Sequence, residues 1–283
     1  MKQGFMSIGK RLLRHLLLGQ KLPQSLIIFI SKLANVNLLI LSYRQMGILN
    51  YENSYISGEE YVIKQVLSQY IKQPAPFFFD VGANQGDYSL ELRSSFPHAH
   101  IFAFEPNPYT FKILKSKLNL STDICCCLGL GSVQKHQTIY TYSDSLDSQH
   151  ASVYKEVLSD IHHAVGFANI EIEITTVDEF CKEHYIEQID FLKIDTEGNE
   201  LDVLIGASRM LAENRIRIIQ FEFNEMNVIS RVFLRDFYSL LNDFDFFRLD
   251  TQRIIPLPQY DTTFEIFKFQ NFLAINKLAR INK

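Results

Sequence analysis

The stretch Phe77–Ser89, which reads FFFDVGANQGDYS, decides the fold. An aromatic run leads into Asp80, and Gly82 and Gly86 follow with Asn84 between them. The apolar run predicts a buried strand, and the two glycines predict a sharp turn into a helix. Ligands of open α/β sheets bind outside the carboxyl ends of the strands, so this turn is a candidate binding loop.

The same alternation of strand and helix continues along the chain and predicts a doubly wound, mostly parallel α/β sheet with helices on both faces. Two closing strands without a long helix between them predict an antiparallel pair at one edge. Residues 129–170 show little pattern beyond a hairpin expected around Thr138–Tyr142. The expected strands are Phe77–Val81, Ile101–Phe104, Ile124–Leu128, Ile189–Ile194, Ile216–Phe223, Phe244–Leu249 and Phe264–Ile275. The expected helices open at Ser57 and Asn107 or span Asp87–Ser95, Val177–Tyr185, Leu201–Leu211 and Ser230–Asp243.

Capping residues indicate where some of these helices begin. Ser57 with Glu60, and Thr176 with Glu179, fit the pattern of a capping box, in which each side chain satisfies a free N–H at the helix start. Asn107 is a suitable cap for another helix because proline follows it at the first helical position. The sequence thus predicts these helix starts to the residue.

Composition bounds the class of protein. The chain has 283 residues, of which 47% are hydrophobic, so it can bury a large core. Its net charge of −4 provides no basic field, which argues against a general nucleic-acid binder. We expect residues 1–50 to form an N-terminal helical extension and residues 51–283 to form the main domain.

The apolar stretch at residues 25–42, SLIIFISKLANVNLLILS, dominates the N-terminal extension. Lys32, Asn35 and Asn37 interrupt it, and a membrane-spanning helix needs about 20 predominantly apolar residues. We therefore expect a helical segment packed on the main domain. Contact of a basic helix with a membrane surface through residues 10–42 is the alternative.

The cysteines bear on the compartment. Cys125, Cys126 and Cys127 are consecutive in an apolar run, Cys181 stands apart, and no C-x-x-C spacing occurs. Neighbouring side chains of a strand point to opposite faces, so the triplet is poorly arranged to hold one metal. We expect buried free thiols in a reducing compartment, which indicates a cytoplasmic protein.

A second acid suggests what the candidate loop binds. Glu105 ends the next expected strand in FAFEPNP, where a carboxylate suits the vicinal hydroxyls of a ribose. The dinucleotide fingerprint G-x-G-x-x-G is broken by Asn84 and Asp87, which would crowd and repel a pyrophosphate. The loop instead suits a cofactor without phosphate and with a cationic centre, such as S-adenosylmethionine, with Asp80 facing its positive end.

Three more carboxylates follow buried strands. Asp195 and Glu197 come directly after a strand in IDFLKIDTEGNE, and Glu222 ends another strand in IQFEFNE. All three are expected at the rim of the cleft that holds the loop. For the first two, an acid pair that complements a helix dipole is the alternative interpretation.

With these residues in view, the chain resembles the FkbM family of S-adenosylmethionine-dependent methyltransferases. The motifs DVGANQGDYS, FEPNP, TTVDEF, IDFLKIDTEGNELDVLIGA and IQFEFN occur in the family's order, from about Asn50 to about Ala274. The resemblance implies the Rossmann-like class I methyltransferase fold with a seven-stranded sheet. It also implies O-methylation of a hydroxyl on a sugar or secondary metabolite, so the expected partner is a small-molecule or glycan acceptor.

The resemblance also assigns roles to residues. It implies a cofactor loop formed by Asp80, Gly82, Asn84 and Gly86, a ribose contact from Glu105, an adenine contact near Leu128 and Gly129, and a reaction side lined by Asp195, Glu197 and Glu222.

The sequence leaves the chemistry of catalysis open. A hydroxyl is a poor nucleophile, so a carboxylate base or a metal ion should remove its proton. Asp195 and Glu222 are the favoured bases, and the three acids with Glu197 could instead hold Mg²⁺. An enzyme for a nucleotide sugar or NAD, or a non-catalytic module on the same fold, is the alternative function. His162 and His163 fit a loop that either covers the substrate or faces solvent.

Overall fold

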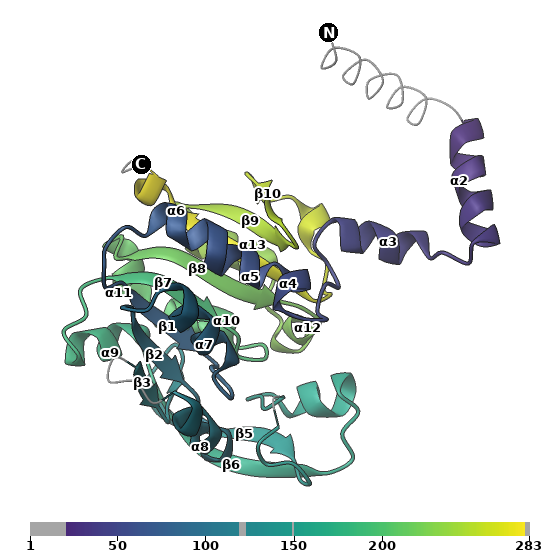
Figure 1. Ribbon diagram of the computed structural model, residues 1–283. Helices are drawn as coiled ribbons and strands as arrows, with labels where there is room; N and C mark the ends of the chain where they lie inside the picture. Colours follow the sequence, from purple (N-terminus) through teal and green to yellow (C-terminus); the bar gives the residue numbers. More distant parts are fainter. Residues whose placement is uncertain (1–20, 119–122, 149, 281–283) are drawn as a thin grey trace. The chain divides into compact units, whose positions relative to one another are not determined.

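The structure is a computed structural model that describes residues 21–118, 123–148 and 150–280 (Figure 1). The chain divides into two compact units, Met1–Gln45 and Met46–Lys283. The boundary of this division lies a few residues before the predicted boundary between residues 50 and 51. The assignment of residues 51–283 as one functional domain stays a prediction.

The described part of the first unit consists of helices α2 (Lys21–Leu33) and α3 (Leu38–Gln45). Most of its large apolar side chains are exposed, Phe29 and Leu33 among them. No single described helix is long and apolar enough to cross a membrane, although Gln24–Leu33 and Leu38–Gln45 together meet that test as two halves bent by 105°. The expectation that this segment packs on the domain stays a prediction.

The second unit is built on an eight-stranded sheet with the order β10-β9-β11-β8-β7-β1-β2-β3. Strands β3, β2, β1, β7 and β8 are parallel, and β11, β9 and β10 pair antiparallel at the opposite edge. The strands are β1 (Phe77–Val81), β2 (His100–Phe104), β3 (Asp123–Cys126), β7 (Ile189–Ile194), β8 (Ile216–Phe223), β9 (Phe244–Asp250), β10 (Arg253–Leu257) and β11 (Gln270–Asn276).

The sheet contains the seven predicted strands and one more. The extra strand is β10, which pairs with β9 across a tight turn and lengthens the antiparallel edge. The prediction also started the last strand too early, because Thr262–Phe264 is a 3-10 turn and β11 begins only at Gln270.

Helices cover both faces of the sheet (Figure 1). Alternate residues of β1 show this, because Phe78 belongs to a core cluster with the helical segment η1 (Val62–Leu67), whereas Phe79 packs in a second cluster with α9. The other helices are α4 (Ser54–Ser57), α5 (Glu59–Tyr61), α6 (Ser68–Tyr70), α7 (Asp87–Ser95), α8 (Pro108–Lys117), α9 (Val177–Glu183), α10 (Glu200–Ile205), α11 (Ser208–Ala212), α12 (Met226–Ser230) and α13 (Leu234–Leu240).

The predicted helix starts at Asn107 and Thr176 are confirmed. The Asn107 side chain accepts from the N–H of Tyr109, and the Thr176 hydroxyl accepts from the N–H of Glu179. The start at Ser57 is wrong, because Ser57 ends α4 and Gly58 follows in the left-handed region with φ 88°. Its hydroxyl bonds instead to the carboxylate of Glu59.

Two helices predicted in the C-terminal half differ from those observed. The first is interrupted at Gly206 and Ala207 between α10 and α11. A Cβ at Gly206 would lie 2.0 Å from the carbonyl oxygen of Gly131, so this position requires glycine. The second, predicted over Ser230–Asp243, is shorter in the structure, because Ser230 is the last residue of α12 and α13 spans only Leu234–Leu240.

Residues 129–175 form a second, three-stranded sheet in the order β4-β6-β5, with β4 at Gly129–Leu130, β5 at Lys135–Tyr142 and β6 at Phe167–Thr175. The predicted hairpin at Thr138–Tyr142 is wrong. That stretch is part of β5, which pairs antiparallel with the distant β6. The connection between them carries a short π-helix, η2 (Val157–Ile161).

The cysteines follow the prediction only in part. All four lie within the described residues and form no disulfide. Cys181 is buried against the main core, but Cys127 is exposed and Cys125 and Cys126 are half-buried. The triplet lies at and beyond β3, the edge strand of the sheet, which has a neighbouring strand on one side only. The cytoplasmic location stays a prediction.

Candidate active site

A cleft of about 850 Å³ opens at the carboxyl ends of β1, β2, β7 and β8 and is bounded by the second sheet. This is the edge at which open α/β sheets bind ligands. Most of the predicted site residues line it: Gly82, Asn84, Glu105, Leu128, Gly129, Asp195, Glu197 and Glu222. Asp80 and Gly86 lie behind its wall.

The loop after β1 is shaped by close packing on the neighbouring strand. Gly82 has φ 75°, and a Cβ there would lie 1.7 Å from the carbonyl oxygen of Asp195. Gly86 has φ 89°, and its Cβ would meet the Leu114 side chain of α8 at 2.7 Å. Protein contacts therefore require both glycines. The sequence led us to expect Gly86 at the cleft, but Gly86 is not among the residues that line it.

Glu105 is held by the same loop. One carboxylate oxygen accepts from the N–H of Asn84 at 3.0 Å, and the other accepts from the N–H of Asn107 at 2.8 Å. Asn84 itself has φ 49°, which turns its N–H toward the acid. Burial raises the pKa of Glu105 to about 7. Each oxygen keeps a further lone pair for a hydroxyl donor in the cleft.

Asp80 performs a different task from the predicted one. It is completely buried, and its Oδ2 accepts from the Ser89 hydroxyl at 2.6 Å. In the register of the parallel strands it stands beside Lys193 of β7, whose Nζ lies 3.6 Å from Asp80 Oδ1. Asp80 therefore faces a cation of the protein itself.

Lys193 links the loop after β1 to the reaction side. Its ammonium lies 3.1 Å from Asp195 Oδ2 and 5.1 Å from the centre of the Tyr88 ring. The neighbouring carboxylates Asp195, Asp80 and Glu59 raise the pKa of Lys193 against the opposing effect of burial, so it stays charged. The ammonium holds the Asp195 side chain in place at the floor of the cleft.

The turn after β7 places Glu197 in the cleft by a strained backbone. Glu197 has φ 56° and Gly198 has φ 103°, and a non-glycine residue in this region costs about 1 kcal/mol or more. Glu200 holds the turn, because its Oε1 accepts from the N–H of Thr196 at 2.9 Å and from that of Gly198 at 3.1 Å. Burial raises the pKa of Glu200 to about 7.

Glu222 ends β8 on the other side of Asp195. The Asn224 amide donates to one of its oxygens. Burial, followed by the charges of Asp195 and Glu197, raises the pKa of Glu222 well above its ordinary value. Glu222 therefore takes up a proton more readily than an exposed glutamate does.

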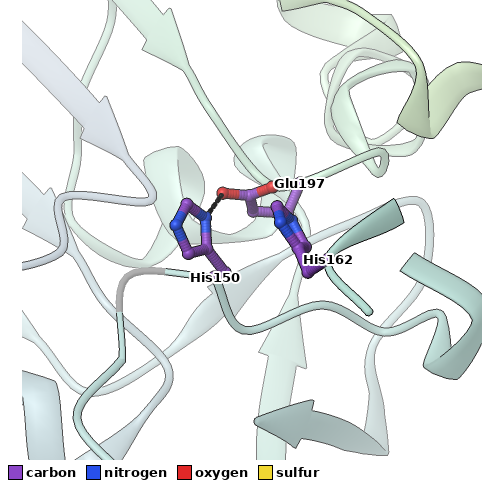
Figure 2. A group of neighbouring side chains, drawn as sticks. All are labelled: His150, His162 and Glu197. Carbon is purple, nitrogen blue, oxygen red and sulfur yellow. Dashed lines mark ion pairs between the residues drawn. The ribbon is translucent and has the colours of Figure 1, made fainter. Parts of the chain in front are cut away.

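Two histidines complete the rim (Figure 2). His150 Nδ1 lies 3.5 Å from Glu197 Oε1, and the rings of His150 and His162 have centroids 4.4 Å apart. The hydrogen bond to Glu197 raises the pKa of His150, whereas burial and the nearby His150 lower the pKa of His162. The two rings thus favour different protonation states.

The Mg²⁺ site predicted on three acids is not supported. Among residues 21–118, 123–148 and 150–280, the group of three or more potential ligands whose atoms all lie within 4.8 Å consists of His150, His162 and Glu197. Asp195 and Glu222 are not part of it. The sequence placed these acids at one rim but could not show how far apart their oxygens lie.

The sequence interpretation missed several residues of the cleft. Lys193 had a readable signal, because a lysine inside the apolar strand IDFLKI must be paired or face a cleft. Glu200 and Glu59 had no comparable signal, since acids near helix starts are common. His150 lies in a segment without periodicity, and only the tertiary structure brings it to Glu197.

Comparison with known proteins agrees with this geometry. The family model described as the methyltransferase FkbM domain matches residues 80–252, which is more than half of the chain. The chain belongs to the FkbM methyltransferase family. The resemblance noted in the sequence is confirmed, and the sheet described above is the class I methyltransferase fold of this FkbM protein.

Individual relatives of this FkbM protein are distant. Methyltransferase sdnD of Sordaria araneosa is 30% identical, over 46% of this chain and 60% of sdnD. The 2-O-methyltransferase NoeI of Sinorhizobium fredii is 25% identical, over 58% of this chain and 70% of NoeI. A crystal structure of methyltransferase FkbM from Methylobacillus flagellatus KT is 14% identical, with a TM-score of 0.44, and the match covers 76% of this chain and 47% of that one. The match to sdnD thus spans less than two thirds of that relative.

Proposed function

We propose that this FkbM protein transfers a methyl group from S-adenosylmethionine to a hydroxyl of a sugar or secondary-metabolite acceptor. The observation that carries the proposal is the position of Glu105, which lines the cleft at the end of β2 and is held there by two backbone N–H groups. A carboxylate held in this way suits the two hydroxyls of a ribose.

The residues present fit this cofactor. The buried Oδ1 of Asn84 has no hydrogen-bond partner, so an acceptor atom of the loop is available beside Glu105. Leu128 and Gly129 provide an apolar wall of the cleft for the adenine. Asp195, which lines the cleft and pairs with Lys193, provides a carboxylate for the cationic part. When bound, the cofactor supplies an electrophilic methyl group.

The protein's part of the reaction is to position the acceptor and take its proton. Proximity and orientation alone can supply roughly 7–11 kcal/mol of the barrier. Glu222 is the favoured base, because it lines the cleft and burial raises its pKa, which makes it a stronger proton acceptor than an exposed carboxylate. Asp195, held by Lys193 at 3.1 Å, serves better as a fixed charge.

The acceptor enters past aromatic side chains. Tyr51 and Phe269 both line the cleft, and their rings lie edge to face with centroids 6.0 Å apart. An exposed aromatic pair of this kind suits the apolar face of a sugar ring. The name of NoeI, a 2-O-methyltransferase, supports oxygen as the methylated atom.

The test is a calorimetric titration of the full chain with S-adenosylmethionine. We expect micromolar binding that the Glu105→Ala substitution weakens at least about 10-fold, because the substitution removes two hydrogen bonds to the ribose. Glu173→Ala, at a residue on the exposed face of β6, is the matched control and should bind like the wild type. No binding by a folded wild type would contradict the cofactor assignment.

A second measurement separates an enzyme from a binding module. Labelled methyl groups should appear on hydroxyl-bearing acceptors, tested as a panel of sugars and polyketides, and Glu222→Gln should reduce that transfer while S-adenosylmethionine still binds. Binding without transfer to any acceptor would favour a non-catalytic protein. Binding of NAD in place of S-adenosylmethionine would favour the alternative enzyme class.

A further inference from the structure

Three potential metal ligands converge on one side of the cleft from separate elements (Figure 2). Glu197 lies in the turn after β7, His150 lies in the segment after β5, and His162 directly follows the π-helix η2. Their ligand atoms all lie within 4.8 Å of one another. A metal ion about 2.0–2.2 Å from each ligand would bring those atoms to about 3.0–3.4 Å. The 3.5 Å between His150 and Glu197 is already close to that spacing.

The backbone behind each ligand is anchored. Ser152, two residues after His150, exchanges backbone hydrogen bonds with Tyr140 of β5, and its hydroxyl donates to the Glu197 carbonyl at 2.8 Å. The N–H of His162 donates to the carbonyl of Val157, which is completely buried. Ser152 thus joins the segment of His150 to β5 and to the turn of Glu197, and the bond to Val157 holds His162 at the end of η2.

Two of the potential ligand atoms make no hydrogen bond in the protein and are available to a metal ion. Glu197 Oε2 and His162 Nε2 are both buried atoms without a hydrogen-bond partner in the protein. A buried polar atom without a partner costs about 1–3 kcal/mol. The backbone of Glu197 also has φ 56°, a strained conformation that directs this carboxylate toward the histidines. No hydrogen bond within the described residues compensates the two buried ligand atoms.

We propose that His150, His162 and Glu197 bind one divalent first-row transition-metal ion, such as Co²⁺, Mn²⁺ or Zn²⁺. Two imidazoles and one carboxylate suit these ions, whereas Mg²⁺ prefers a set of oxygen ligands. Three protein ligands leave coordination positions open, as in catalytic rather than structural metal sites.

The open positions face the cleft, since all three residues line it. The role of the ion, unlike its binding, rests on the proposed function. A hydroxyl oxygen of the acceptor would bind at an open position, which lowers the pKa of that hydroxyl. Its proton would pass to Glu222, and its oxygen would form the new bond to the methyl carbon as the carbon–sulfur bond of the cofactor breaks.

The test is a titration of the chelator-treated full chain with Co²⁺. Binding is monitored through the visible absorption bands of Co²⁺, which report imidazole and carboxylate ligands. We expect one equivalent to bind. Loss of an outer-shell partner alone costs about 10–100-fold in metal affinity, so His150→Ala and His162→Ala should each weaken binding at least about 10-fold. His163→Ala is the matched control, because His163 is an exposed imidazole next to the site, and it should bind Co²⁺ like the wild type.

The stoichiometry of Co²⁺ binding is measured on the wild type, so it tests the site even where a variant fails to fold. Circular dichroism is the check that each variant folds. Wild-type binding no tighter than that of the double variant His150→Ala/His162→Ala would overturn the site. So would an equal loss in His163→Ala. Titration of the metal-free protein with S-adenosylmethionine separates the two proposals. Cofactor binding without a Co²⁺ site would remove only the metal proposal, and a Co²⁺ site without cofactor binding would remove only the proposed function.

Discussion

Glu200 shows how a buried acid shapes the site without facing a ligand. It is only 2% exposed, and one of its oxygens accepts from the backbone of Thr196 and Gly198 in the turn that presents Glu197. Burial raises its pKa from the ordinary 4.5 to about 7. The folded state therefore binds this proton more tightly than the unfolded state does. The contribution of Glu200 to the free energy of unfolding is fully present below pH 4.5 and is lost as the pH rises through about 7.

This reasoning predicts the effect of Glu200→Gln, which keeps the oxygen that accepts these bonds and removes the titrating group. At pH 8 the variant should exceed the wild type in free energy of unfolding by up to about 3 kcal/mol, and the difference should vanish near pH 4.5. Denaturant unfolding of both proteins at several pH values measures it. A difference that does not change with pH would contradict the assignment.

At the scale of residues, the sequence predicted positions better than partners. Asp195, Glu197 and Glu222 reach the cleft because each follows the carboxyl end of a strand, and that placement follows from the strand alone. The sequence could not predict that Lys193 is the partner of Asp80, because only the register of β1 and β7 places the two residues side by side. Register is a property of two strands and their packing.

At the scale of elements, the start of α8 joins a helix to the segment that covers the cleft. The Asn107 side chain accepts from the N–H of Tyr109, and its amide donates to the Leu146 carbonyl at 2.7 Å. One residue thus caps the helix that follows β2 and tethers the chain after β5.

Two substitutions separate these functions of Asn107. Asn107→Ala removes both bonds and should lower the free energy of unfolding by about 1–2 kcal/mol. Asn107→Ser keeps a capping hydroxyl, so it should cost less, but it is too short to reach Leu146. Both variants should speed hydrogen exchange in residues 143–148. If Asn107→Ala and Asn107→Ser are equally stable, or if hydrogen exchange is unchanged in both variants, the contacts of Asn107 contribute little.

Elements with a local signal were predicted, and those defined by distant pairing were not. Asn107 and Thr176 carry their capping chemistry in the side chain itself. Strand β6, for example, pairs with β4 and β5, from which a long connection separates it in the sequence. Gly206 breaks a periodic apolar pattern only because the backbone of Gly131 approaches it. No window of sequence contains that approach.

At the scale of the whole molecule, the parallel sheet supplies the floor of the cleft and the second sheet supplies a wall. The order of β1, β2, β7 and β8 gathers the ends of four strands that are distant in sequence. The alternation of strands and helices was sufficient to predict this floor. It was insufficient for the wall, because residues 129–175 show no periodicity that distinguishes their strands. The two histidines of the proposed metal site come from this part of the chain.

The core clusters of the second unit consist of its own residues. Their buried residues run from Val62 to Ile275, and none of the described residues 21–45 is among them. Removal of residues 1–45 should therefore change the free energy of unfolding by no more than about 1 kcal/mol. Because exposed apolar side chains such as Leu26, Phe29 and Leu33 are lost with it, the shortened chain should also associate less with itself and with lipid vesicles.

Denaturant unfolding and light scattering of the full and shortened chains check these expectations, with S-adenosylmethionine binding as a control for an intact cleft. The same comparison decides whether the N-terminal helices pack on the domain, as the sequence led us to expect. Packing would bury their apolar face against the second unit, and its removal would cost about 25 cal/mol for each Å² of apolar surface newly exposed. A loss of several kcal/mol in the shortened chain would therefore contradict an independent core and establish the packed extension.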